Sequence, residues 1–132
     1  MSVAPQANID ALFAALLQKM LESARIPLTD EKETQRYISE CLQANHTRHK
    51  REHRLSSRDI IDLWVPHSDG GGVAIEVKLH HARPADVLRQ LTRYAAHDCV
   101  RTIFLVSNRA MALPPEINGK PLHYISLGRG WL

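Results

Sequence analysis

The sequence predicts an α/β domain in which helices flank a mixed β-sheet. Apolar residues recur every three or four positions before residue 45 and at alternate positions after residue 60, so helices should precede strands. A strand–helix–strand order in the second half of the chain predicts a right-handed crossover between parallel strands. With 132 residues, 44% hydrophobic and 23% charged, the chain should form one domain: a helical extension over residues 1–29 and a core over residues 30–127.

Two helices are expected first. After a frayed start, Asn8 is a candidate cap for a helix that Pro27 should end. Asp30 and Glu33 resemble a capping pair that opens a second helix. Its buried stripe would consist of Tyr37, Ile38, Cys41 and Leu42. The helical pattern fails near Asn45.

A β-hairpin is expected over residues 60–79. Residues 60–65 and 73–79 alternate between two faces, and residues 66–72 have the composition of a turn. In the first strand, one face should carry Ile61, Leu63 and Val65, and the other Ile60, Asp62 and Trp64. The hairpin supplies the antiparallel part of the predicted sheet.

The register of this hairpin brings two acidic residues together. If the turn is centred on Asp69, the apolar faces match and Asp62 stands opposite Glu76, with their Cβ atoms about 5 Å apart. Two such carboxylates repel each other unless a cation neutralises them, and Mg²⁺ or Mn²⁺ prefers oxygen ligands of this kind. Lys78 shares the face of Glu76 and could orient a water or stabilise charge on a phosphate. The plain alternative is a surface ion pair between Glu76 and Lys78.

The remaining elements complete the sheet. Pro84 can open a helix with an apolar stripe formed by Val87, Leu88, Leu91 and Ala95. Residues 100–106 are mostly apolar, as in a strand covered on both faces, and residues 122–127 are a last strand candidate.

A basic stretch covers residues 46–58, with a net charge of +4 in a chain whose total is +3. Such a patch favours a polyanionic partner, nucleic acid first, although a solvated loop or helix end would look the same. Short pairing strands are expected near residues 54–56. His46, His49 and His53 would share one face of a helix, but nothing nearby completes a convincing zinc site.

Two motifs together resemble a known family. Asp62 followed by Glu76-Val77-Lys78 resembles the active-site pattern of the PD-(D/E)XK nuclease superfamily. Gln90 and Tyr94, one helical turn apart, are similar to the Gln-x-x-x-Tyr motif of the branch that includes recombination exonuclease domains and phage-type nucleases. The resemblance implies a restriction-endonuclease-like fold and metal-dependent hydrolysis of DNA, endonucleolytic or exonucleolytic.

The resemblance also implies roles for individual residues. Asp62 and Glu76 would bind Mg²⁺ or Mn²⁺, Lys78 would act on the water or the transition state, and Gln90 and Tyr94 would shape the site. A helix Glu should complete the metal site: Glu33 is preferred, and Glu40, Glu52 and Glu22 remain open. The rival hypothesis is a nuclease-fold adaptor that binds nucleic acid or protein without catalysis.

Partners and location follow in the same way. Phosphate contacts are expected from Arg48, Lys50, Arg51, Arg54, Arg58, Arg89 and Arg93. Nucleases of this kind often act as dimers, so a homodimer is compatible with the resemblance. No apolar run approaches the roughly 20 residues of a membrane span. Cys41 and Cys99 are far apart in sequence, which is typical of a reduced, cytoplasmic protein.

Overall fold

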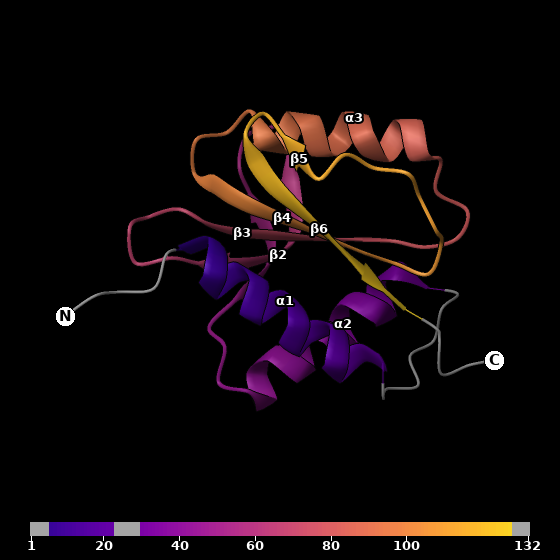
Figure 1. Cartoon of the computed structure of the whole chain (residues 1–132). Helices are drawn as coiled ribbons and strands as arrows, with labels where there is room; N and C mark the ends of the chain where they lie inside the picture. Colours follow the sequence, from indigo (N-terminus) through magenta and orange to yellow (C-terminus); the bar gives the residue numbers. More distant parts are fainter. Residues whose placement is uncertain (1–5, 23–29, 128–132) are drawn as a thin grey trace.

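The computed structural model describes residues 6–22 and 30–127 and confirms the α/β class, with three helices and a six-stranded mixed sheet (Figure 1). The elements in chain order are α1 (Gln6–Glu22), α2 (Glu31–Ala44), β1 (Lys50–Arg54), β2 (Ile60–Pro66), β3 (Gly72–Lys78), α3 (Pro84–Ala95), β4 (Val100–Ser107), β5 (Glu116–Ile117) and β6 (Lys120–Ser126). In the described ranges, none of the helices is both long and apolar enough to cross a membrane.

The sheet has the strand order β1-β2-β3-β4-β6-β5. Strands β1, β2 and β3 are antiparallel neighbours, β3, β4 and β6 run parallel, and β5 is antiparallel to β6. The hairpin register is confirmed, since Val65 pairs with Val73 and Leu63 with Ile75. The expected parallel crossover is also confirmed, with α3 connecting β3 to β4.

Helices cover both faces of the sheet, as Figure 1 shows. On one face α1 and α2 bury Leu17, Leu21 and Ile38 against β3 and β4. On the other face α3 buries Val87 and Leu91. The helix of the expected extension therefore contributes directly to the core.

The hairpin depends on a glycine at the start of β3. A Cβ atom on Gly72 would lie only 2.6 Å from the ring of Trp64 and 2.6 Å from the carbonyl oxygen of Val65. Both contacts are far too close for a side chain, so only glycine lets β3 approach β2 here. This close approach accommodates the register that places Asp62 beside Glu76.

Some boundaries differ from the expectations. Helix α1 begins at Gln6, so Asn8 lies inside the helix and is not its cap. Helix α2 is capped as expected by Asp30, whose Oδ1 accepts the N–H of Lys32 at 2.9 Å, and it ends at Ala44. The frayed start was expected over residues 1–7, but residues 6 and 7 already belong to α1; residues 1–5 and the expected helix end at Pro27 lie outside the described residues.

The basic stretch contains strand β1, which pairs as expected but lies over Lys50–Arg54 and not over residues 54–56. Its backbone pairs with β2, and the His53 ring stacks on Trp64 with the ring centres 4.7 Å apart. His49 lies before the strand and contacts Ser39 Oγ at 2.6 Å and the carbonyl of Thr47 at 2.9 Å. The helical face that the histidines would have shared does not form.

The two faces of β2 do not alternate regularly. Ile61 packs with Trp64 on the α3 side, whereas Leu63 packs on the α1 and α2 side. The prediction that Ile61 and Leu63 share a face is therefore wrong. The alternation breaks at Asp62, where the regular pairing of β2 with β3 stops.

Candidate active site on strands β2 and β3

Two carboxylates replace backbone hydrogen bonds at the point where the β2–β3 pairing stops. The Val77 N–H donates to Asp62 Oδ2 at 2.8 Å, and the Asp62 N–H donates to Glu76 Oε1 at 3.3 Å. Each acid is therefore held by the backbone of the other strand. This reciprocal arrangement fixes both side chains without using their second oxygens, Asp62 Oδ1 and Glu76 Oε2.

The surroundings of the pair penalise two negative charges. The Glu76 side chain is 2% exposed, and its burial together with the charge of Asp62 raises the pKa of Glu76 to about 8. Asp62 is half-buried, and burial raises its pKa as well. Ionisation of both acids is therefore disfavoured here, and a bound divalent cation would favour it.

Lys78 provides the cation nearest to the pair among the described residues. Its Nζ lies 3.5 Å from Glu76 Oε2, on the same face of β3, and its side chain is 21% exposed. The three groups that the sequence predicted to meet, Asp62, Glu76 and Lys78, are therefore together at the carboxyl end of β3. The ion pair is mostly shielded from water, unlike the surface pair that was the plain alternative.

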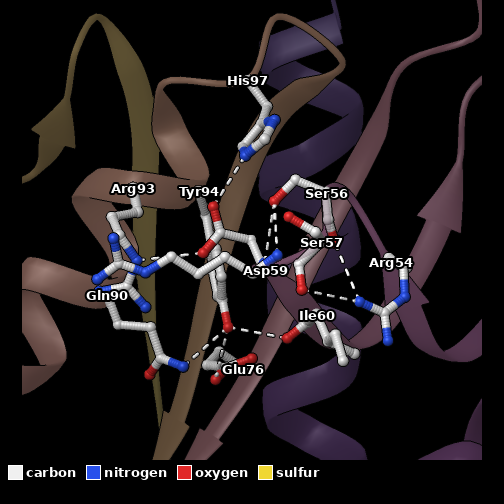
Figure 2. Close-up of polar contacts among 11 residues, drawn as sticks. Arg54, Ser56, Ser57, Asp59, Ile60, Glu76, Gln90, Arg93, Tyr94 and His97 are labelled. Carbon is white, nitrogen blue, oxygen red and sulfur yellow. Dashed lines mark hydrogen bonds and ion pairs between the residues drawn. The ribbon is translucent and has the colours of Figure 1, made fainter.

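The Gln90 and Tyr94 side chains reach the same site from α3 (Figure 2). Gln90 Nε2 donates to Tyr94 Oη at 2.8 Å. Tyr94 Oη donates to the carbonyl of Ile60 at 2.9 Å and lies 3.4 Å from Glu76 Oε2. Burial and the charge of Glu76 raise the pKa of Tyr94, so the phenol stays protonated and acts as a hydrogen-bond donor.

The structure does not bring Glu33 to the pair. Glu33 Oε2 lies 2.9 Å from Arg36 Nη2, and its side chain is 46% exposed. The other three candidates also have partners elsewhere: Glu40 pairs with Arg36, Glu52 with Lys32, and Glu22 accepts from Gln18.

Glu31, the first residue of α2, is an acid that reaches the end of β3 beside the site. Its Oε1 accepts the Leu79 N–H at 3.4 Å, and its charge adds to the effect of burial on the pKa of Asp62. Sequence reasoning missed it, although a signal existed. Glu31 is four residues before Gln35 and seven before Ile38, so the periodicity of the buried stripe places it on the face that packs against the sheet.

The predicted phosphate contacts fall into two groups. Five of them are exposed on β1 or beside it: Arg48, Lys50, Arg51, Arg54 and Arg58. In the described parts of the chain none of these five forms an ion pair with a carboxylate. Arg89 and Arg93 on α3 are already paired, with Asp86 and Asp59. The structure thus separates cations without a carboxylate partner near the sheet edge from ion-paired ones on α3, although Arg54 donates to the carbonyls of Ser56 and Ser57.

The arrangement can bind a hard divalent cation through two carboxylates and present an ammonium group beside it. Over the described residues, no three His, Cys, Asp or Glu side chains are close enough to hold a metal ion by themselves. Mg²⁺ normally keeps several waters and uses only one or two carboxylates plus substrate oxygens, so Asp62 and Glu76 fit this ion. No family model matches the chain, and no curated protein and no solved structure matches it either.

Proposed function

We propose that this protein is a metal-dependent nuclease of the PD-(D/E)XK type that hydrolyses phosphodiester bonds in DNA, with a restriction-endonuclease-like arrangement of its sheet. One observation carries the proposal: buried Glu76 lies against Asp62, with Lys78 Nζ 3.5 Å away on the same strand. Such a pair is costly for stability, and perturbed carboxylates beside an amine are typical of catalytic sites. The contacts of Gln90 and Tyr94 with the same site support the proposal independently.

The chain's own residues divide the work as follows. Asp62 and Glu76 would hold Mg²⁺ or Mn²⁺ through the oxygens that the backbone leaves free. When bound, the cation would lower the pKa of a water molecule and neutralise charge on the phosphate. Lys78 offers an ammonium group where negative charge develops on the phosphate, and Tyr94 orients Glu76. Glu33 has no part in this site, and Glu31 acts on Asp62 through its charge and not as a third metal ligand.

DNA would be held through its phosphates. The exposed cations of β1 and its flanks lie on the strand next to β2, which carries Asp62. Contacts of this kind position the backbone without reading bases, so recognition would depend on the shape or ends of the substrate.

The test is a cleavage assay with labelled duplex, single-stranded and branched DNA and with RNA, each in Mg²⁺, Mn²⁺ or chelator. Cleavage of at least one DNA substrate should require the cation. Asp62→Asn and Glu76→Gln should lower the rate by about a hundredfold to a thousandfold. Asp69→Asn is the matched control, because Asp69 is an exposed acid in the β2–β3 turn, with a 59% exposed side chain.

Two outcomes would contradict the proposal. Cleavage that survives both variants would come from a contaminating enzyme. Binding of DNA without cleavage under any condition would favour the nuclease-fold adaptor instead.

A further inference from the structure

A cavity of about 320 Å³ opens beside the carboxylate pair. Its walls include Glu31 at the start of α2, Lys78 at the end of β3, and Arg83, Asp86 and Gln90 at the start of α3. The volume is at the lower end of the range for small-ligand pockets, so it suits a single nucleotide or a phosphate group but not a duplex.

Two of the residues that line the cavity also belong to the candidate active site. Lys78 contacts Glu76, and Gln90 donates to Tyr94. A group bound in the cavity would therefore lie directly beside the carboxylates. The cavity is a continuation of the site along the carboxyl end of β3, and not a separate pocket elsewhere on the surface.

The acidic residues of the cavity already have side-chain partners. Glu31 Oε1 lies 3.8 Å from His81 Nε2, and Asp86 pairs with Arg89. A second metal ion would have to displace those partners. The acids therefore do not make the cavity a cation site.

Two guanidinium groups beside the cavity, those of Arg83 and Arg109, have no carboxylate partner among the described residues. Arg109 Nη1 donates to the carbonyl of Ala82, a cavity residue, at 2.7 Å. Within residues 6–22 and 30–127, neither Arg83 nor Arg109 forms an ion pair with a carboxylate. Both side chains are exposed, so they could turn towards an anion in the cavity. A guanidinium group suits this role because it can donate two parallel hydrogen bonds to the oxygens of one phosphate.

The start of α3 adds donors on the same side. Arg83 occupies the cap position of α3 and its side chain caps no N–H of the first turn, while Pro84 after it has no N–H to donate. Helix α2, by contrast, is capped by Asp30. The N–H groups that follow Pro84 at the helix start favour phosphate, and they accompany the Gln90 amide and two arginines that form no ion pair within the described residues.

From these observations we infer that the cavity is a phosphate subsite, which binds a phosphate of the substrate strand next to the one that is cleaved. The inference rests on the proposed function for its substrate class, a nucleic-acid strand. That phosphate is either the terminal phosphomonoester of the strand or an internal phosphodiester. Arg83 and Arg109 would hold it, with Gln90 and the start of α3 as further donors.

The experiment measures binding without cleavage. Octanucleotides labelled at one end, with or without a phosphate on the other end, are titrated with the protein in chelator and at several salt concentrations. Arg83→Gln and Arg109→Gln should each weaken binding about fivefold to tenfold and lower the salt slope by about 0.7. Arg101→Gln is the matched control. Arg101 contacts Asp69 near the start of β4, at the end of the sheet away from the cavity.

The two strands identify the source of the phosphate. If the variants lose affinity only for the phosphorylated strand, the cavity binds a terminal phosphate and the enzyme acts at strand ends. If the variants lose affinity equally for both strands, the cavity binds an internal phosphate. Unchanged affinity and salt slope in both variants, or no binding of either strand by the wild type, would overturn the inference.

Failure of the nuclease proposal would look different. If the protein binds the strands through Arg83 and Arg109 but never cleaves DNA, the phosphate subsite stands and the nuclease proposal is wrong. If the protein cleaves DNA while both variants bind as tightly as the wild type, the nuclease proposal stands and the subsite is wrong. Melting curves of both variants should match the wild type, since both side chains are exposed.

Discussion

Asp59 and Asp62 are three residues apart, yet their surroundings are opposite. Asp59 is buried with Arg93 Nε at 3.1 Å and His97 Nε2 at 3.0 Å, as Figure 2 shows. The hydrogen bond with His97 and the charge of Arg93 hold the pKa of Asp59 below its usual range. Asp62 instead lies against another carboxylate, and burial raises its pKa. One acid is neutralised by its neighbours, and the other is not.

The contrast separates a structural ion cluster from a functional one. The Asp59 cluster joins the segment before β2 to α3 and is complete as it stands. The Asp62 and Glu76 pair is fixed by backbone N–H groups but lacks enough positive charge, so it should lower stability until a cation binds. Sites that bind charge commonly carry this cost.

The largest difference in stability should appear when Asp59 and Asp62 are each replaced by asparagine. Asp59→Asn should lower the free energy of unfolding by about 2 kcal/mol, less than for a fully buried pair because Arg93 and His97 are 35% and 27% exposed. Asp62→Asn should leave stability unchanged or increase it, since it removes the repulsion with Glu76. Urea unfolding without divalent cations measures both, with Asp69→Asn as control. Equal losses in the two variants would remove the distinction between the clusters.

Added cation should affect only one of the two clusters. At a free Mn²⁺ concentration of ten times its Kd, binding to the folded state stabilises the protein by about 1.4 kcal/mol. The melting temperature of the wild type should therefore rise by roughly 5 °C. Asp59→Asn should show the same rise, and Glu76→Gln should show none. A rise that persists in Glu76→Gln would place the bound ion elsewhere.

Much of this site could be predicted because it depends on hairpin register. Matching apolar faces fix the pairing of β2 and β3, and that pairing determines the distance between Asp62 and Glu76. The break in alternation at Asp62 could not be predicted, because it arises where carboxylates replace backbone partners, a tertiary effect.

Strand β1 and the helix acid show two other reasons for misassignment. The sequence of β1, Lys50–Arg54, has no apolar alternation, and it forms a strand because β2 offers an edge and Trp64 a stacking surface. Glu33 fitted the expected distance from Asp62 near the start of the second helix, and Glu31 was not among the four candidates, although helical phase favours it. Distance along the sequence does not tell which face of the helix a side chain occupies, whereas periodicity does.

Acid should weaken the Asp59 cluster specifically. The pKa of Asp59 is lower in the folded state than in the unfolded chain, where it is about 3.9. The contribution of Asp59 to stability is therefore complete above the unfolded pKa and is lost as the pH falls through the folded pKa. The stability difference between wild type and Asp59→Asn should therefore shrink from about pH 5 to about pH 3. Urea unfolding across this range measures it. A constant difference would mean that Asp59 contributes by packing and not by its charge.

The smallest effect should come from Tyr94, which connects the two clusters. Arg93 reaches Asp59 and the adjacent Tyr94 reaches Glu76, so one turn of α3 contacts both acids. Tyr94→Phe keeps the buried ring but leaves the Ile60 carbonyl without its donor, which should cost about 1 kcal/mol of stability. A positioning role also predicts a severalfold lower kcat with little change in KM, together with a weaker Mn²⁺ shift. If only stability falls, Tyr94 supports the fold alone, and the contact between α3 and Glu76 has no part in cleavage.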